Sequence, residues 1–418
     1  MGVLSPQAVA STYLDAVVEH CERFLVHGRD RFGPRHTPLF VDGLDVRRLE
    51  AAEFVYGGRA DGAGGGCRNK LARRDQMPGE RWILSNLASQ ADFFRVLDGL
   101  SSITGDPRFR EGAEGALEYG LRELRARSGL LYWGGHIAYD CGRDVPVAEQ
   151  TEHELKCHFP YYALMAEVDR RRTLDFVDAF WNAHVLDWRS LDMNRHGSEF
   201  FWKPPRIRMW RRPYRPPPVP FEGDGRAFCN TACDMMAAAA FRYQKDGNQR
   251  ALRWAERLAQ RYADARHEVT GLGGRQFTTT GDDRARAQFS AEFGAIANDA
   301  NILSPAMMVF RYGRLPVCYL NIAEQVGGEV GDTFRRLAVE DLIAFGLHAY
   351  DADANMIHAM FTDGRRIELN AVVRAGHYYD PTDPGRITKM RCYRVGGTFL
   401  WAYAMAYRRS VERRLLPT

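Results

Sequence analysis

Three short motifs in the middle of this chain contain histidines, and one of them adds a glutamate and another an arginine. WGGH covers residues 133–136, HELKCH covers 153–158 and NRHG covers 194–197. Imidazole and carboxylate groups drawn from distant segments suit a divalent transition metal that keeps open positions for a substrate. Glycines beside a histidine let the backbone approach a ligand closely. These motifs predict a metal site assembled across the chain. The alternative is that each histidine is an ordinary core or surface residue.

HELKCH looks like the H-E-x-x-H motif of zinc proteases, but three residues separate Glu154 from His158. If residues 153–168 form a helix, as their periodicity predicts, then His153 and His158 point in different directions about the helix axis. Glu154 and His158 are four residues apart and would share a face. The spacing therefore excludes the protease interpretation. It leaves Glu154 and His158 as the two residues of this motif that could bind one metal together.

Longer stretches around these motifs resemble a known family. GLLYWGGHIAYD, HELKCHFPYYALMAEVD, AFWNAHVLDW and DMNRHG together are similar to polysaccharide lyase family 2, the metal-dependent pectate lyases. The resemblance is densest over residues 81–202. It implies an α/α barrel and a metal held by His136, Glu154 and His196. The metal would be Mn²⁺, with Co²⁺ or Ni²⁺ as alternatives, and Arg195 would be the Brønsted base.

The activity that this resemblance implies is β-elimination in polygalacturonate or oligogalacturonates, giving 4,5-unsaturated products. A metal on the uronate carboxylate would neutralise it and make the C5 proton acidic. Arginine is an unusual base because its guanidinium group normally stays protonated. A second role for Arg195, as a clamp on the substrate carboxylate, therefore stays open. The expected partner is an acidic oligo- or polysaccharide, and the oligomeric state is left open.

Other polar and aromatic residues are candidates for substrate contact or proton transfer. A core or surface role is the alternative for each, and Asp140 and Asp192 are additional candidates for orienting a metal-bound imidazole. The substrate-binding candidates are Tyr139, Lys156, His158, Trp202, Arg275 and Gln276.

Two other function classes remain as alternatives. A glycoside hydrolase of the same fold would act on uronide-containing oligosaccharides without metal, and Glu292 and Asp299 are its candidate carboxylate pair. A non-catalytic helical scaffold would use its histidines only structurally. Survival of activity after chelation would favour the hydrolase, and normal metal content in a His196→Ala variant would favour the scaffold.

Helices must position these residues, because apolar residues recur at three- and four-residue spacing along most of the chain. Thr-Gly-Asp-Pro at 104–107 and Lys-Asp-Gly at 245–247 carry the turn chemistry that joins antiparallel helices. We therefore predict a mainly α protein, an α/α barrel of antiparallel helical hairpins with short β-strand decorations. An open solenoid is less favoured because no strict repeat is found. The predicted helices are 7–27, 83–104, 108–127, 153–168, 171–187, 230–243, 246–265 and 330–349.

The whole chain, 1–418, is predicted to be a single catalytic domain. A Gly-rich run at 56–66 is interpreted as an insertion, and a Pro-rich segment at 204–220 as an extended connector. Short β-like segments at 274–280 and 389–398 are expected to decorate loops.

Composition narrows the partners and the compartment. The formal charge is +4, from 57 basic and 53 acidic residues, so a nucleic-acid partner is not expected. No apolar stretch is long enough to cross a membrane, so no membrane partner is expected. The eight cysteines show no paired spacing and the N-terminus shows no secretory signal. Together these features predict a cytoplasmic protein, with a periplasmic location as the less favoured alternative.

Overall fold

The computed structural model describes residues 6–55, 81–135, 137–148, 152–198, 208–287, 289–367, 393–394, 396–410, 412 and 415. The chain divides into two compact units. Unit 1 comprises Met1–Ala183 and His196–Lys203, and unit 2 comprises His184–Arg195 and Pro204–Thr418. The unit boundary thus falls between two consecutive residues, Arg195 and His196. Whether the units form one domain stays a prediction.

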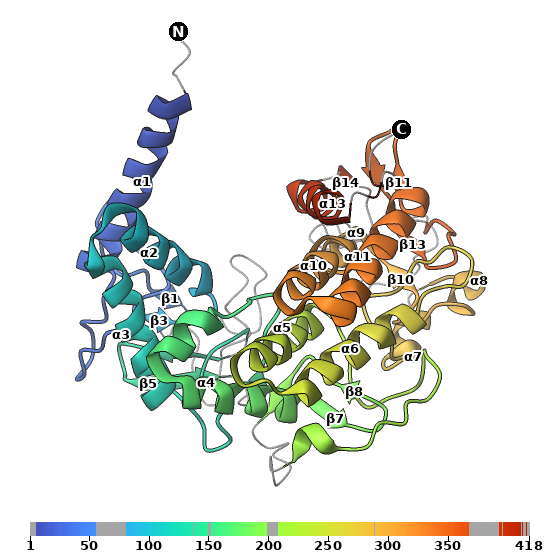
Figure 1. The fold of residues 1–418 in the computed structure, drawn as a ribbon, viewed down its shortest axis with the longest axis horizontal. Helices are drawn as coiled ribbons and strands as arrows, with labels where there is room; N and C mark the ends of the chain where they lie inside the picture. Colours follow the sequence, from blue (N-terminus) through green and yellow to red (C-terminus); the bar gives the residue numbers. More distant parts are fainter. Residues whose placement is uncertain are drawn as a thin grey trace. The chain divides into compact units, whose positions relative to one another are not determined.

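Unit 1 is built from helices and short strands (Figure 1). The central three-stranded sheet has the order β3-β4-β5, with antiparallel pairing throughout. The helices are α1 (Pro6–His27), α2 (Ala91–Thr104), α3 (Pro107–Glu123) and α4 (Tyr162–His184), whose last residue belongs to unit 2. The strands are β1 (Phe54–Val55), β2 (Arg81–Trp82), β3 (Leu84–Ser85), β4 (Ile137–Asp140), β5 (Val145–Ala148), β6 (Glu152–His153) and β9 (Gly197–Ser198).

The α2–α3 hairpin forms where its turn residues predict it. Gly105 takes a positive φ of 76° and ends α2, and its N–H donates to the carbonyl oxygen of Ser101. Asp106 is the N-cap of α3, and its side chain accepts the N–H of Arg108. Pro107 occupies the first helical turn, where a missing N–H costs nothing. The turn prediction at 104–107 is confirmed.

Unit 2 contains longer helices connected by short helical turns and two-residue strands. Its main helices are α5 (Cys229–Asp246), α6 (Gln249–Asp264), α10 (Leu315–Val326), α11 (Gly328–His348) and α13 (Gly397–Ser410). The shorter ones are η2 (Met209–Arg211), α7 (Asp282–Arg286), α8 (Ala291–Gly294), α9 (Pro305–Met308) and the π-helix η3 (Val309–Arg314). The strands are β7 (Val185–Asp187), β8 (Asp192–Met193), β10 (Ile302–Leu303), β11 (Tyr350–Asp351), β12 (Met356–Ile357), β13 (Met360–Phe361) and β14 (Tyr393–Arg394).

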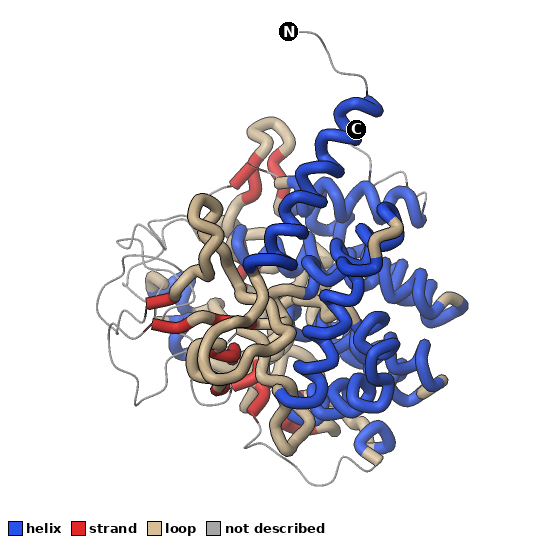
Figure 2. The backbone as a smooth tube through the Cα atoms, turned by 90° about the vertical axis from the view of Figure 1, so that its left-hand side faces the viewer, coloured by secondary structure: helices blue, strands red, loops and turns tan. Residues whose placement is uncertain are grey.

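Consecutive helices of unit 2 pair as α5 with α6 and α10 with α11, and they lie side by side in Figure 1. Gly247 ends α5 in a left-handed conformation, with a φ of 73°. Asn248 then caps α6, because its side chain accepts the N–H groups of Arg250 and Ala251. In Figure 2 the strands are short red segments between tan loops, and blue helices dominate.

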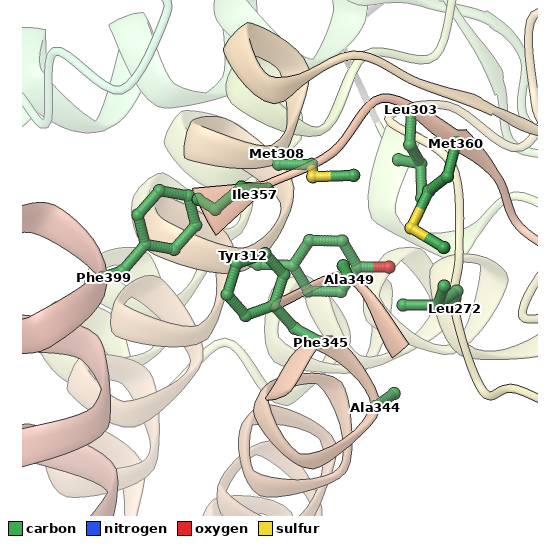
Figure 3. Packing of buried hydrophobic residues seen from close by; sticks show 10 residues of the cluster. All are labelled: Leu272, Leu303, Met308, Tyr312, Ala344, Phe345, Ala349, Ile357, Met360 and Phe399. Carbon is green, nitrogen blue, oxygen red and sulfur yellow. The ribbon is translucent and has the colours of Figure 1, made fainter. Parts of the chain in front are cut away.

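Aromatic stacking holds part of the core of unit 2 together (Figure 3). Phe345 of α11 stacks on Phe399 of α13, with ring centroids 4.9 Å apart, and on Tyr312 of η3 at 5.1 Å. All three are buried. The Tyr312 hydroxyl also accepts the N–H of Gly273, so this core fixes the start of the segment that carries Arg275 and Gln276.

The prediction of a mainly α chain with helical hairpins and short strands is confirmed. Two predicted helix starts are wrong, however. Residues 81–85 form β2 and β3, so the helix predicted from 83 begins only at Ala91. The helix predicted from 153 begins at Tyr162, and β6 precedes it. Pro160 explains the second error, because proline lacks an N–H and disfavours a helical conformation at Phe159.

Three further predictions concern loops. The Gly-rich run 56–66 and part of the Pro-rich segment, 204–207, lie outside the described residues. In the described part of that segment, Met209–Arg211 form η2, 212–218 have no regular secondary structure and 219–220 form a bend. Of the two β-like segments, 274–280 forms only a parallel bridge between Phe221 and Thr278, and 389–398 contributes β14.

In the described part of the chain, no helix is long and apolar enough to cross a membrane.

Candidate active site

A short antiparallel strand pair brings Glu154 and His196 together in unit 1. In the β6–β9 pair, His153 lies opposite Gly197. Glu154 follows β6 and His196 precedes β9, so the pairing places these two residues at the same end. One oxygen of Glu154, Oε1, lies 3.6 Å from Nε2 of His196. The Glu154 side chain is fully buried, whereas 22% of the His196 side chain is exposed.

The two glycines of WGGH lie directly against Glu154. The N–H of Gly135 donates to the carbonyl oxygen of Glu154 at 2.7 Å. A Cβ atom on Gly135 would lie 2.7 Å from Oε2 of Glu154, closer than packing allows. Gly134 has a φ of +123°, and a Cβ there would lie 2.4 Å from the same carbonyl oxygen. Only glycine fits at position 134, and a side chain at position 135 would force the Glu154 carboxylate to shift. His136, the next residue, lies outside the described residues.

Lys156 and His158 lie on the loop that follows β6. Nζ of Lys156 is 2.5 Å from Oε2 of Glu154, so the two carboxylate oxygens face different neighbours. Nδ1 of His158 accepts the N–H of Lys156 at 2.7 Å. Burial, and then the Lys156 ammonium group, lower the pKa of His158. Because this loop is not helical, the shared helix face predicted for Glu154 and His158 does not exist.

The conformation of this loop is unusual. Cys157 and Phe159 have φ values of 57° and 46°, which side chains with a Cβ rarely adopt. The guanidinium group of Arg95 on α2 donates to the carbonyl oxygen of Phe159, which holds the loop from outside. Strained backbone of this kind is concentrated at functional sites.

His153, the first histidine of HELKCH, belongs to the core. It is fully buried, and the indole N–H of Trp133 donates to its Nε2 at 3.2 Å. Its ring also contacts Phe176 and Phe180 edge-on. His153 is therefore part of the apolar core of unit 1.

Asn86 is a structural residue of this site that the sequence did not indicate. Its side-chain amide donates to the carbonyl oxygen of Gly134 at 2.7 Å, and its side-chain oxygen accepts the N–H of Gly134 at 3.0 Å. Asp42 in turn accepts the backbone N–H of Asn86 and the side-chain amide of Gln90, both at 2.8 Å. Burial raises the pKa of Asp42 to about 6, and these hydrogen bonds oppose the rise. The chain Asp42–Asn86–Gly134 thus ends against Glu154.

Arg195 belongs to unit 2, where two backbone anchors fix its segment. His184 is fully buried, its carbonyl oxygen accepts the N–H of Asn194, and its Nδ1 lies 2.9 Å from the carbonyl oxygen of Asn194. The N–H of Arg195 donates to the carbonyl oxygen of Arg226 at 3.0 Å. The residue predicted as the base is therefore held through its own N–H and through the main chain of the preceding residue.

Arg195 and Arg275 share one aromatic ring. The Cζ of Arg275 lies 3.9 Å from the ring centroid of Phe228, and the Cζ of Arg195 lies 5.0 Å from it. Both distances are within the range of a cation–π contact. We call these three residues the Phe228 cluster. The structure thus brings together two of the residues singled out from the sequence, and it adds Phe228, which the sequence did not indicate.

Several predicted roles do not fit the structure. Gln276 is fully buried and its amide donates to the carbonyl oxygen of Thr278 at 2.6 Å, so it is not placed to meet a polymer. Tyr139 is buried as well, and its hydroxyl group lies 3.4 Å from Oδ1 of Asp144. Burial raises the pKa of Tyr139. Trp202 lies outside the described residues.

The carboxylates singled out from the sequence lie in well-defined local surroundings. Asp140 accepts the backbone N–H groups of Ile83 and Gly142, and Asp192 accepts those of Asp224 and Gly225, so both fix loops. Glu292 and Asp299 do not share a helix, because α8 ends at Gly294. Within the described residues, no group of three or more His, Cys, Asp or Glu side chains is arranged to hold a metal.

Comparison with known proteins identifies the family. Residues 37–418 match the family described as periplasmic pectate lyase. This chain belongs to that family. It is 30% identical over 392 residues to the pectate disaccharide-lyase of Dickeya dadantii (strain 3937), covering 88% of this chain and 67% of that protein. The prediction of a polysaccharide lyase that acts on pectate is confirmed, and the hydrolase and scaffold alternatives are wrong.

Two solved structures are similar to the lyase at low sequence identity. A D-mannose isomerase matches with a TM-score of 0.48 and 12% identity, covering 97% of this chain and 83% of that chain. The cellobiose 2-epimerase of Spirochaeta thermophila DSM 6192 matches with a TM-score of 0.34 and 13% identity, covering 78% and 86% respectively.

The predicted cytoplasmic location is wrong, because the family is one of periplasmic enzymes. The prediction rested on the cysteines and on the absence of a visible secretory signal, and the structure explains why the cysteines were uninformative. Among the described residues, the free cysteines are buried except for the half-buried Cys157. Burial raises the pKa of Cys21 to about 11 and raises that of Cys141 further. A thiol that stays protonated and enclosed is unreactive, so its reduced state says nothing about the compartment.

Proposed function

We propose that this pectate lyase is metal-dependent and that His136, Glu154 and His196 hold a divalent transition metal, preferably Mn²⁺. The observation that carries the proposal is the 3.6 Å distance between Oε1 of Glu154 and Nε2 of His196. Two ligand atoms that each lie about 2.1 Å from one ion can be up to about 4.2 Å apart, so this pair fits a shared ion. The glycines against Glu154 precede His136 directly in sequence.

The donor set also fits the chemistry of such a site. A carboxylate and imidazoles suit manganese, cobalt or nickel with open positions for substrate oxygens. Lys156 binds Oε2 of Glu154, so Oε1 is the oxygen directed to His196. When bound, the metal would supply Lewis-acid stabilisation of the negative charge that develops on the uronate carboxylate.

Arg195 is proposed to accept the C5 proton of the galacturonate unit. The C5–H and C4–O bonds break, a C4=C5 double bond forms, and the leaving glycosidic oxygen takes up a proton. The products are a shortened saccharide and a 4,5-unsaturated uronide. Backbone anchoring of Arg195 through His184 and Arg226 supports this role, because a base must be held within hydrogen-bond reach of the proton that it removes.

Metal analysis of the purified full chain tests the proposal. Wild type reconstituted with Mn²⁺ and then desalted is expected to retain about one ion per chain. Glu154→Gln and His196→Ala should lose it, together with the ultraviolet absorbance of unsaturated product. His348→Ala is the matched control, since His348 is exposed at the end of α11 and should leave metal content unchanged. Stoichiometric metal in both site variants would refute the proposal.

Chemical rescue separates the two roles of Arg195. Arg195→Ala should lose roughly 10²–10⁴-fold in kcat, the typical contribution of a general base. If Arg195 is the base, added amines of different basicity should restore activity in proportion to their base strength. Restoration by guanidinium ions alone, regardless of base strength, would instead assign Arg195 as a clamp on the carboxylate.

The product is proposed to be an unsaturated disaccharide. The support is the 30% identity to a protein named pectate disaccharide-lyase. Chromatography of early reaction products from polygalacturonate tests it. A dominant disaccharide from the first minutes is expected, and a ladder of long oligomers would contradict it.

A further inference from the structure

Phe228 lies at the end of a loop, residues 223–228, that is hydrogen-bonded along its length. Asp192 accepts the N–H groups of the second and third residues of this loop. Four of its carbonyl oxygens accept hydrogen bonds, which leaves the loop little freedom to move. These bonds come from Thr280 to Gly223, from Thr278 to Gly225, from Arg195 to Arg226 and from Tyr262 to Ala227.

The backbone also fixes the direction of the Phe228 side chain. Phe228 is the N-cap residue of α5, with φ −74° and ψ 131°. Its carbonyl oxygen accepts the N–H groups of Thr231 and Ala232, both at 3.1 Å. The residue is 3% exposed, so its ring is packed on most sides. The ring therefore provides a stationary surface.

Both arginines are tied to this point through their main chains as well as their side chains. The N–H of Arg195 donates to the carbonyl oxygen of Arg226, two residues before Phe228. The carbonyl oxygen of Arg275 accepts the N–H of Cys229, the residue after Phe228, at 2.7 Å. The guanidinium groups then lie over the Phe228 ring at 5.0 and 3.9 Å. Their separation cannot exceed the sum of those two distances.

A guanidinium group held in place matches a carboxylate. Arginine presents planar N–H donors that bind carboxylate oxygens in parallel pairs. The attraction of a cation to an aromatic face offsets part of the repulsion between the two positive groups. The ring thus lets two cations from separate segments occupy one small region.

We infer that Phe228 is a positioning residue that holds Arg275, which binds the carboxylate of a galacturonate unit, beside Arg195, the proposed base for the same unit. This inference rests on the proposed function, in which Arg195 acts on that unit. Phe228 itself touches no reacting atom. Its part is to hold Arg275 where a uronate carboxylate can pair with it, whereas a neutral or esterified sugar cannot.

The test compares Phe228→Leu and Phe228→Tyr in the full chain. Leucine keeps an apolar side chain without an aromatic face, and tyrosine keeps the face. We expect Phe228→Leu to weaken digalacturonate binding, measured calorimetrically, by roughly tenfold and to raise KM on polygalacturonate similarly, with a smaller change in kcat. Phe228→Tyr should stay within about twofold of wild type. Phe241→Leu is the control, because Phe241 is also on α5 and also 3% exposed.

An Arg275→Gln variant, alone and combined with Phe228→Leu, shows whether the ring acts through the arginine. If it does, the double variant should bind digalacturonate no more than about twofold more weakly than Arg275→Gln alone. Fully additive losses, or unchanged binding in a folded Phe228→Leu, would overturn the inference. Failure of the proposed function is a separate result, because it shows as absent metal or as an Arg195→Ala variant that keeps its activity, while digalacturonate binding still depends on Phe228.

Discussion

The carboxylate of Glu154 and the imidazole of His196 lie 3.6 Å apart, although the whole of α4 and the β7–β8 pair separate them in sequence. The β6–β9 strand pair closes that distance. Lys156 contacts the other carboxylate oxygen of Glu154, and Gly134 and Gly135 pack against Glu154. The candidate metal site thus depends on backbone pairing as much as on its ligands.

Gly135→Ala is expected to damage metal binding without removing any ligand. The new Cβ would lie 2.7 Å from Oε2 of Glu154, so the carboxylate must shift. We expect Mn²⁺ affinity to fall by roughly 10–100-fold, as for other changes around a metal ligand. Titration of the purified variant measures this. Gly99→Ala on α2 is the control, since no atom lies within 4 Å of its added Cβ, and its affinity should be unchanged.

Lys156→Met should destabilise the protein in a way that Mn²⁺ reverses. The change leaves the fully buried carboxylate of Glu154 without its ammonium partner. Removing one partner of a buried pair costs about 3–5 kcal/mol, and the partial exposure of Lys156 reduces this to about 1–3 kcal/mol. Thermal unfolding with and without Mn²⁺ tests it. Lys156→Arg should retain most of the stability, and a Lys156→Met deficit that is insensitive to Mn²⁺ would contradict the assignment of Glu154 as a ligand.

Asn86→Ala should lower both stability and metal affinity. The variant removes two hydrogen bonds to Gly134 and leaves its buried backbone groups unpaired, at a cost of about 1–3 kcal/mol. Because Gly134 packs on Glu154, we also expect Mn²⁺ affinity to fall by roughly tenfold. Asn248→Ala provides the comparison: it removes the α6 cap at a cost of about 1 kcal/mol. Equal metal affinity in both variants would show that Asn86 is only a structural residue.

Asp42 should make the folded protein less stable as pH rises from about 4 to about 6. Its pKa is raised by burial from 3.8 to about 6, so between these values the folded state holds a proton that the unfolded chain has released. The stability that this proton contributes is complete below pH 3.8 and is lost as pH passes 6. A pKa increase of this size changes the free energy of unfolding by at most about 3 kcal/mol. Because Asp42 is only half-buried, we expect about 1–2 kcal/mol.

Asp42→Asn tests this sign. Asparagine keeps an oxygen that can accept the bonds from Asn86 and Gln90 but does not titrate, so the pH-dependent loss should disappear. Urea unfolding of wild type and variant from pH 4 to 7.5 gives the difference directly. Asp45→Asn, at a carboxylate whose pKa is lowered by backbone hydrogen bonds, should not flatten the curve. A wild-type stability that rises with pH relative to Asp42→Asn would contradict the prediction.

Local sequence determined much of the helical framework. Turn residues at 104–107 and 245–247 act within a few residues of themselves, so Asp106 and Gly247 could be assigned without tertiary information. α10 was missed because its residues are apolar around most of its circumference, which removes the periodic signal of a half-buried helix. A helix predicted from 153 was wrong although Pro160 was visible.

The sequence by itself determined the family, the class of helical hairpins and the residue types of the candidate site, because motifs and short-range periodicity carry that information. Only the tertiary structure decided which of those residues meet. It placed His196 rather than His158 across from Oε1 of Glu154, turned His153 into the core, buried Gln276 and set Arg195 and Arg275 over Phe228. Such contacts depend on strand pairing and loop closure between residues far apart in the chain, and no local pattern encodes their register.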